Sequence, residues 1–437
     1  MARDHISLAR TWAMSVTTAV MLIAALTGCT SQIEEQPVPQ PRKEDVVRLD
    51  YWTPFSGGDN QFMTEMVERF NKEQSEIVVV QTNSRLDDYY TRLRTAILSG
   101  NAPDIAIIHT TSMPQFVQNG YIEEVTATAE QVGLDLSQLN SNIRESTEYN
   151  GESYAVPLDT HALVMYYNKK HLRQAGVLDE STGKPIIEPG EQGFREFLEK
   201  IRQALPNDVA PMAMPSTRID SVWLWWSLYN QMEGGGSFYN EQGKTAINNP
   251  QSLRALTFID ELYKNELIGA NINDSFKLFY DGKAAVLILG MWGTGAFEKS
   301  SELELGVVTV PVLYDRPAQW GDSHSLAIPK KHNLSNEKRR AAMVFSKWMV
   351  EHGELWAQAG HVPSMTKVVE SDAFNRLEYR NDYAAAADHV VYWPRHPKQW
   401  SIIEILIAEF ERMIYKKQTP EEALRQAQLK ADAKLEE

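Results

Sequence analysis

The residues of this 437-residue chain that are best suited to chemistry are tryptophans and short acidic side chains. Sugar rings have flat C–H faces that pack on aromatic rings, and their hydroxyl groups donate hydrogen bonds to carboxylates. A carbohydrate pocket therefore needs both residue types. The tryptophans to consider are Trp52, Trp223, Trp225, Trp226, Trp292 and Trp320, and the matching acceptors are Asp59, Asp159 and Asp322.

Several of these residues also have a purely structural interpretation. Trp223, Trp225 and Trp226 occupy nearby positions of one predicted helix and point in different directions, so at least one belongs to the core. Asp59 follows two glycines and opens a helix, where a capping carboxylate contributes about 1 kcal/mol. The same carboxylate is also placed to face a ligand, and both interpretations of Asp59 stay open at this point.

Familiar catalytic motifs are absent from the sequence. Residues 242–245 resemble the end of a phosphate-binding loop, but Phe238 stands where the first glycine of that motif belongs. The chain has no HExxH and no G-x-S-x-G motif, and its histidines are scattered. We therefore predict no catalytic residue, no metal and no cofactor. A pair of carboxylates at about 5–10 Å, as a glycosidase uses, remains open because the sequence does not give the distance.

The N-terminus has the pattern of an export signal. Arg3 and Arg10 precede an apolar run at residues 13–26, which is too short to span a bilayer stably. The run ends in Leu-Thr-Gly-Cys29, and Cys29 is the only cysteine. This tetrapeptide resembles the lipobox of bacterial lipoproteins, in which the cysteine is lipidated. We predict a signal peptide at residues 1–28, then lipidated Cys29 and a flexible linker to residue 45.

Charge and length restrict the function classes further. The formal net charge of the chain is −15 at pH 7, which disfavours nucleic acids and anionic lipid surfaces as partners. No second apolar run is long enough to cross a membrane. About 390 residues follow the signal and the linker, and at about 100–200 residues per domain they predict two lobes.

From residue 46 onward, the pattern predicts alternating strands and helices. Residues 46–52, 77–81 and 105–108 have the apolar patterns of strands, and residues at helical spacing lie between them. This order predicts a doubly wound α/β lobe, whose ligands bind beyond the carboxyl ends of the strands. We therefore expect the ligand site to include residues at those ends, namely Trp52, Ser56, His109 and Thr110.

Several short motifs follow one another along the chain. None is diagnostic of a family by itself, but their order is. They include Tyr51-Trp52-Thr53, Gly100-Asn101-Ala102-Pro103-Asp104-Ile105, Tyr154-Ala155-Val156-Pro157, Tyr166-Tyr167-Asn168-Lys169, Phe279-Tyr280-Asp281-Gly282-Lys283 and Gly290-Met291-Trp292. This order resembles the extracellular solute-binding proteins of ABC importers. Within them, the chain is most similar to the sugar-binding group that includes maltose-binding protein.

The resemblance implies an α/β fold of the periplasmic-binding-protein type. Two lobes close as a clamp, each is a mostly parallel sheet flanked by helices, and the chain crosses several times at a hinge. By similarity, the first crossing lies near Pro157. The implied lobes are residues 46–156 plus 306–350 and residues 157–305 plus 351–437, with residues 305–310 as a strand that returns to the first lobe.

The resemblance also implies site residues. Trp292 matches the stacking tryptophan of the family, and Asp159 and His161 stand just past the crossing, where the family lines its groove. The turn that contains Trp320 and Asp322 is expected to face the cleft. Two further candidates are Trp226, from the tryptophan-rich helix, and His361, which is placed either to bind ligand or to hydrogen-bond at the hinge.

The function implied is that of a lipid-anchored, extracytoplasmic binding subunit of an ABC importer. It would capture a mono- or oligosaccharide and deliver it to the permease, as a monomer that binds no nucleic acid. Two alternatives remain open. One is a lipid-anchored carbohydrate hydrolase, and the other is a clamp of the same fold for a phosphorylated ligand, which would need arginine or lysine at the groove.

The predicted tether can be tested on Cys29. We expect Cys29→Ser to leave the protein uncleaved or to release it into the medium, because serine offers no thiol for lipidation. Cell fractionation with mass spectrometry of the N-terminus measures this. A correctly cleaved Cys29→Ser protein that stays on the membrane would place the tether elsewhere.

Overall fold

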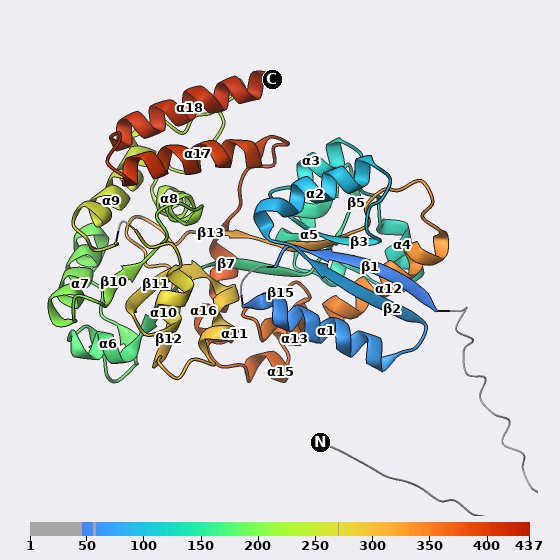
Figure 1. Cartoon of the computed structure of the whole chain (residues 1–437), viewed down its shortest axis with the longest axis horizontal. Coiled ribbons are helices and arrows are strands. Elements are labelled where there is room, and N and C mark those ends of the chain that lie inside the picture. Colours follow the sequence, from blue (N-terminus) through green and yellow to red (C-terminus); the bar gives the residue numbers. More distant parts are fainter. Residues whose placement is uncertain (1–45, 56–57, 270) are drawn as a thin grey trace, which may run out of the picture. The chain divides into compact units, whose positions relative to one another are not determined.

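Two β-sheets organise the part of the chain that the computed structural model describes, residues 46–55, 58–269 and 271–437 (Figure 1). The first sheet has five strands in the order β2-β1-β3-β14-β6, and the second has seven strands around β7. Each sheet with the helices packed on it is called a lobe below. This mixed α/β architecture confirms the predicted fold class. The predicted signal peptide, Cys29, the linker and Ser56 lie outside the described residues.

The first lobe begins with three parallel strands. β1 (Val47–Thr53) pairs with β2 (Ile77–Asn83) and with β3 (Ile105–His109). α1 (Asp59–Glu73) follows β1, and α2 (Leu86–Leu98) follows β2. The first four residues of β3 are buried, as expected for a strand covered on both faces. The predicted strand–helix order is therefore confirmed, and β1 and β3 end at the same edge of the sheet.

Later parts of the chain complete the first sheet. β14 (His324–Ala327) pairs antiparallel with β3, and β6 (Val156–Pro157) pairs antiparallel with β14. The register places His324 opposite His109. α12 (Asn336–Glu351) packs on β1, and its N-terminus is capped by the side chain of Ser335.

The second sheet is built around one long buried strand, β7 (Asp159–Asn168). β7 pairs antiparallel with four neighbours, whereas the β10–β11 and β13–β16 pairs are parallel. This arrangement differs from the mostly parallel sheet that the family resemblance implied. The other strands of this sheet are β10 (Ala210–Ala213), β11 (Ala284–Gly290), β12 (Leu305–Thr309), β13 (Gln319–Asp322), β15 (Val362–Pro363) and β16 (Val390–Val391).

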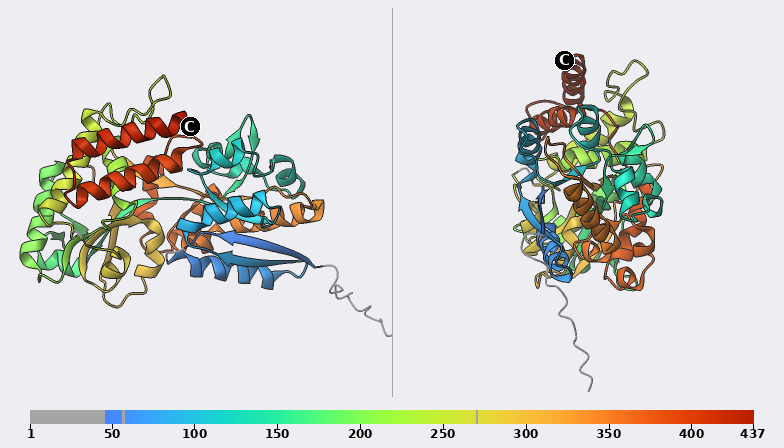
Figure 2. Two further views of the ribbon diagram at one scale, coloured as in Figure 1. Left: turned by 45° about the horizontal axis from the view of Figure 1, so that its top comes forward. Right: turned by 90° about the vertical axis from the view of Figure 1, so that its right-hand side faces the viewer.

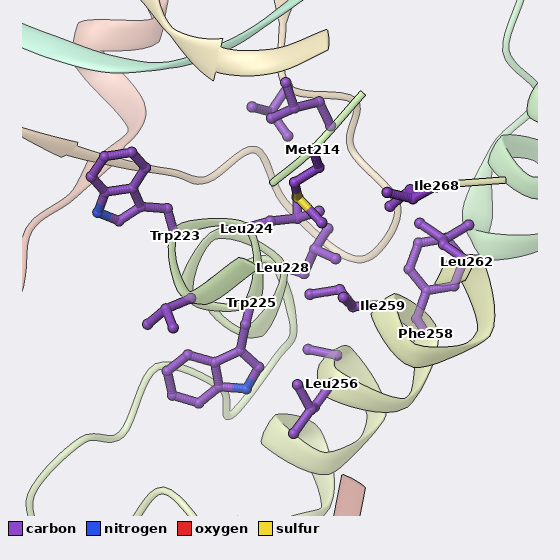
Figure 3. Close-up of a cluster of buried hydrophobic side chains, with 14 of the residues drawn as sticks. Met214, Trp223, Leu224, Trp225, Leu228, Leu256, Phe258, Ile259, Leu262 and Ile268 are labelled. Carbon is purple, nitrogen blue, oxygen red and sulfur yellow. The ribbon is translucent and has the colours of Figure 1, made fainter. Parts of the chain in front are cut away.

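The tryptophan-rich segment forms α8 (Asp220–Gln231), in which every residue is buried. α8 packs against α9 (Pro250–Lys264) and against β13 of the second sheet. Leu228 faces Ile259 of α9, whereas Trp223 points away from α9 (Figure 3). α17 (Gln399–Ile414) and α18 (Pro420–Glu436) lie side by side at the C-terminus (Figures 1 and 2).

The remaining elements complete the two lobes. In the first half of the chain they are α3 (Met113–Gln118), α4 (Thr126–Gln131), η1 (Leu136–Gln138), α5 (Ser141–Thr147), β4 (Glu148–Tyr149), β5 (Glu152–Ser153), α6 (Lys169–Gln174), β8 (Leu178–Asp179), β9 (Lys184–Pro185) and α7 (Gly190–Ala204). In the second half they are α10 (Ser275–Tyr280), η2 (Met291–Gly293), α11 (Thr294–Phe297), α13 (Gly353–Ala357), α14 (Thr366–Val369), α15 (Asp372–Asn375), α16 (Arg380–Tyr383) and η3 (Ala384–His389). Within the described ranges, none of the helices is long and apolar enough to span a bilayer.

The two lobes are joined where the chain passes from one sheet to the other. Residues 157–159 connect β6 to β7, and residues 322–324 connect β13 to β14. A third passage follows α13, whose Trp356 packs in the first core, and leads into β15 of the second sheet. These three passages are called the crossings below. They agree with the several hinge crossings that the resemblance implied.

Two details of the implied lobes need correction. Residues 305–310 do not return to the first lobe, because β12 pairs with β7 in the second sheet, and the return occurs at β14. Residues 353–368 do not pass wholly into the second lobe at residue 351, because Trp356, Met365 and Val368 pack in the first core while β15 between them pairs with β7. The apolar pattern of a strand does not reveal which strand it pairs with. The lobe to which these segments belong could therefore not be predicted from their own sequence.

Candidate functional site

A cavity that opens to solvent lies where the two lobes meet, at the carboxyl ends of β1 and β3. The first lobe contributes Pro54, Phe55, Asp59, Leu86, Tyr90, His109, Thr111 and His324 to its lining. The second lobe contributes His161, Arg218, Ile219, Trp223, Trp292, Trp320, Asp322, Trp393 and Trp400.

Three tryptophans of the second lobe form what we call the aromatic wall, Trp223, Trp292 and Trp320. The rings of Trp223 and Trp320 stack with centroids 4.1 Å apart and an interplanar angle of 16°. Trp292 stands edge-on to Trp223 at 5.7 Å. The three rings come from α8, η2 and β13, so separate segments hold them in place. The wall gives the cavity an apolar surface with fixed geometry.

A glycine permits the position of Trp292. A Cβ added at Gly290, the last residue of β11, would lie 1.7 Å from an atom of the Trp292 ring. Any side chain at residue 290 would therefore displace the indole. The close approach explains in physical terms why Gly290 directly precedes the Met291-Trp292 segment.

The wall also carries unused polar atoms. The indole N–H groups of Trp223 and Trp320 are buried and have no hydrogen-bond partner among the described residues. Asp59 Oδ1 is likewise buried and has no hydrogen-bond partner among the described residues. Buried polar groups in folded proteins nearly always have partners, and leaving one without costs about 1–3 kcal/mol. Two donors and one acceptor at this cavity are thus available to a polar ligand.

Asp322 is held firmly by the first lobe. Its Oδ2 accepts the hydroxyl of Thr111 at 2.5 Å, and its Oδ1 accepts the backbone N–H of Ser323 at 2.9 Å. Burial raises the pKa of Asp322 above its ordinary value, although the charge of His161 and the Thr111 hydroxyl oppose the shift. The carboxylate therefore links β13 to the segment after β3 at the cavity floor.

A buried group at this floor is called the crossing cluster and consists of Asp159, His161, His324 and His361. His161 and His324 line the cavity, and Asp159 and His361 lie beneath them. Asp159 Oδ2 lies 2.7 Å from His324 Nδ1 and 3.5 Å from His361 Nδ1, and Asp159 Oδ1 lies 3.1 Å from His161 Nδ1. Trp356 donates its indole N–H to Asp159 Oδ2 at 2.6 Å. The members stand at the three crossings, so one carboxylate connects all three passages of the chain.

Burial and hydrogen bonding act in opposite directions on this cluster. Burial alone would raise the pKa of Asp159, but the imidazoles of His324 and His361 and the hydrogen bonds from His161 and His324 hold it well below its ordinary value. Burial lowers the pKa of His324, although Asp159 opposes the shift. The pKa of His109 is also lowered, mainly because the ring is buried and to a smaller extent because of electrostatic repulsion from His324 and His161. The arrangement is a buried carboxylate surrounded by three imidazoles.

Six of the twelve predicted ligand residues line the cavity: Asp59, His109, His161, Trp292, Trp320 and Asp322. Asp59 is not the N-cap of α1, because the helix begins at Asp59 and Gly58 holds the capping position. Its carboxylate is consequently directed to the cavity instead of to the first turn.

Five other predicted residues do not line the cavity. Asp159 and His361 lie beneath the floor and are fully buried. Trp52 lies instead with its ring beneath Arg92. Thr110 contacts Ser146, while its neighbour Thr111 lines the cavity. Trp226 stacks on Trp393 and donates its indole N–H to Val391 O. The twelfth residue, Ser56, is outside the described residues.

Some residues of the cavity lining were not selected from the sequence. The sequence offered Trp223 only as one of three tryptophans on a predicted helix. The rotation of α8 about its axis places Trp223 in the cavity lining. Trp225 instead lies in the core, where its indole N–H donates a hydrogen bond to the carbonyl oxygen of Ser252. Phe55, Tyr90, Thr111, His324, Arg218, Trp393 and Trp400 also line the cavity. Trp393 and Trp400 follow the last strand, where no local motif indicates a site.

The histidines are scattered in the sequence but not in space. Asp159, His161, His324 and His361 each offer one atom suited to a metal, and these atoms all lie within 4.8 Å of one another. The reason given for expecting no metal therefore fails, because the crossings bring together residues that are up to 202 positions apart, as from 159 to 361. Motif spacing cannot detect a site of this kind.

Comparison with known proteins places this site in context. A family model described as bacterial extracellular solute-binding protein matches residues 56–354. The maltotriose-binding protein of Pyrococcus abyssi is 24% identical over 329 residues, which cover 72% of this chain and 66% of that protein. An arabinooligosaccharide-binding protein of Halalkalibacterium halodurans is 26% identical over 276 residues, 58% of this chain and 56% of the relative. The chain thus spans about two thirds or less of these relatives.

Solved structures share the fold. The ABC substrate-binding protein Lmo0181 from Listeria monocytogenes, in complex with cycloalternan, has a TM-score of 0.78 at 22% identity and covers 90% of this chain and 99% of its own. UgpB from Mycobacterium tuberculosis, in complex with glycerophosphocholine, has a TM-score of 0.78 at 18% identity and covers 89% and 98%. At these identities the likeness concerns the fold alone.

The role of Asp159 can be measured through stability. We expect Asp159→Ala to lower the free energy of unfolding by about 3–5 kcal/mol, because it leaves the buried donors of His161, His324 and Trp356 without their acceptor. Asp159→Asn should cost less, since its amide oxygen still accepts a hydrogen bond. Denaturant midpoints at unchanged m-value measure both.

The matched control is Asp388→Ala, at an exposed position, which should stay within about 0.5 kcal/mol of the wild type. An Asp159→Ala protein that loses less than about 1 kcal/mol would show that the crossings do not depend on this carboxylate.

Proposed function

The chain belongs to the bacterial extracellular solute-binding proteins, and we propose that it binds a carbohydrate between its two lobes and delivers it to an ABC permease. The observation that carries this proposal is the aromatic wall with its two unpartnered indole N–H groups. The wall offers a flat apolar face for a sugar ring and donors for its hydroxyls.

The opposite side of the cavity supports the same ligand class. Asp59 has a free carboxylate oxygen, and the imidazole rings of His109 and His161 line the floor. Carbohydrates need acceptors as well as donors, because each hydroxyl both donates and accepts. Trp393 and Trp400 extend the aromatic surface of the second lobe, which suits a ligand of more than one ring. The relatives named for maltotriose and arabinooligosaccharide agree with this choice.

Capture and delivery follow from the position of the cavity. Residues from both lobes line it, so a ligand that contacts both sides favours approach of the lobes about the crossings. We propose that the protein works as a monomer at the outer face of the cell membrane, held by a lipid on Cys29. The charge of −15 agrees with a partner other than nucleic acid.

A hydrolase is the weaker alternative. Asp59 and Asp322 share the cavity, and Asp322 has a raised pKa, as a general acid requires. However, Asp322 Oδ2 is bonded to the Thr111 hydroxyl and Oδ1 to the Ser323 N–H. Both carboxyl oxygens of Asp322 thus already accept hydrogen bonds from the protein itself, which supports a structural role for this carboxyl.

A phosphorylated or choline-bearing ligand is the second candidate. Arg218 lines the cavity, and a cage of tryptophans is a known receptor for quaternary ammonium groups. The structural neighbour in complex with glycerophosphocholine has the same fold. Because Arg218 is the only arginine or lysine in the described lining, the carbohydrate remains the proposal of choice.

The ligand class can be tested by thermal shift on the full chain. The panel should contain maltotriose, arabinotriose, glucose and glycerophosphocholine, in a detergent without a sugar head group so that the detergent does not occupy the site. A ligand at a hundred times its Kd stabilises the folded state by about 2.7 kcal/mol. We expect an oligosaccharide to raise the melting temperature. A shift with glycerophosphocholine alone would favour the second candidate, and product release from a sugar would favour the hydrolase.

The aromatic wall can be tested through Trp292. We expect Trp292→Ala to weaken sugar binding by about 1–3 kcal/mol, the range for one aromatic surface, and to change stability less. Calorimetric titration and denaturant unfolding measure the two quantities. Trp348→Ala is the control, because Trp348 stacks on His352 outside the cavity and should leave sugar affinity unchanged. A Trp292→Ala protein with normal affinity and a loss of about 3–5 kcal/mol in stability would instead be a core variant.

A further inference from the structure

We infer that the crossing cluster is a binding site for one divalent transition-metal ion, with Zn²⁺ as the best fit. The four residues are Asp159, His161, His324 and His361, and each is buried. Three imidazoles and one carboxylate are a ligand set that suits tetrahedral zinc. This inference does not depend on the identity of the ligand in the cavity above.

The geometry of the ligand atoms supports a single ion. In a tetrahedral site with bonds of about 2.0–2.2 Å, neighbouring ligand atoms lie about 3.3 Å apart. The three histidine Nδ1 atoms lie 2.7, 3.1 and 3.5 Å from oxygens of Asp159. All four candidate atoms fall within 4.8 Å of one another. Small side-chain adjustments are therefore enough to bring them to one ion.

His361 gives an independent reason to expect an ion. Its side chain is fully buried, yet neither Nδ1 nor Nε2 has a hydrogen-bond partner among the described residues. A cluster held only by hydrogen bonds would leave this imidazole unsatisfied at a considerable cost. A metal ion bound to His361 Nδ1, the nitrogen that faces Asp159, would give this atom the partner that it lacks.

The surroundings have the features of an outer coordination shell. Metal-bound histidines usually direct their second nitrogen at a carboxylate, and Asp59 Oδ2 lies 3.8 Å from His361 Nε2. Ligating carboxylates are themselves hydrogen-bonded, and Asp159 accepts the Trp356 indole N–H at 2.6 Å. Asp59 and Asp159 together carry the two negative charges that balance a divalent cation when both are ionised.

Four protein ligands leave no open position, so the site would be structural and not catalytic. Asp159, His324 and His361 lie at the three crossings, and His161 lies in β7 just after the first of them. The ion would tie these passages together from below. His161 and His324 also line the cavity, so the same ion would fix the floor on which a ligand rests.

The test uses the full chain without a polyhistidine tag, stripped with a chelator and dialysed. We expect calorimetry with Zn²⁺ to give one equivalent of tight binding and a raised melting temperature that the chelator reverses. Co²⁺ should give the intense visible absorption of a tetrahedral complex. Failure of the wild-type protein to bind one equivalent of either ion would overturn the inference without any variant.

Variants then locate the site. His361→Gln should abolish the one-equivalent binding and the tetrahedral Co²⁺ spectrum, and Asp59→Asn should lower zinc affinity about 10–100-fold, as loss of an outer-shell carboxylate does. His332→Asn removes an exposed histidine and should change neither. Circular dichroism of each metal-free variant checks that it is folded. Undiminished binding in a folded His361→Gln protein would assign the metal to a different site and contradict the inference.

Discussion

The burial of one carboxylate at the point where the chain passes between its sheets is the constraint on which the rest of the structure depends. Asp159 has no exposed surface, so its charge must be balanced by hydrogen bonds from within the protein. Those bonds come from His161, His324 and Trp356, which belong to three different segments. Satisfying a single buried group therefore fixes the relative positions of all three crossings.

That constraint has direct consequences for the cavity. The histidines that bond to Asp159 have ring faces on the cavity floor, and the ring centroid of His161 lies 5.4 Å from that of Trp292 in the aromatic wall. The polar floor belongs to the crossings, whereas the apolar wall belongs to the second lobe. A ligand with flat faces and many hydroxyls, such as a sugar, meets both surfaces when the lobes enclose it. The proposed binding function thus depends on how the chain connects its lobes.

The sequence predicted the features that are encoded locally. The apolar runs of β1, β2 and β3 and the helices between them could be assigned because their periodicity lies within short windows. The family order of motifs added the two-lobed architecture and directed attention to Trp292. Pairing of β12 with β7 and the approach of His361 to Asp159 could not be assigned, because they depend on contacts between distant segments. The sequence could not decide whether Trp223 faces the cavity or the core. That depends on how α8 is rotated about its axis where it packs against α9.

The central claim is that a sugar rests on the aromatic wall. Fluorine NMR of the 5-fluorotryptophan-labelled protein tests it most directly, with the signals of the 11 tryptophans assigned from single Trp→Phe variants. At saturation with a bound oligosaccharide, the account predicts that the signals of Trp223, Trp292 and Trp320 shift, while those of Trp225 in the core and Trp348 on α12 stay in place. Saturable binding that leaves all three wall signals unmoved would contradict it.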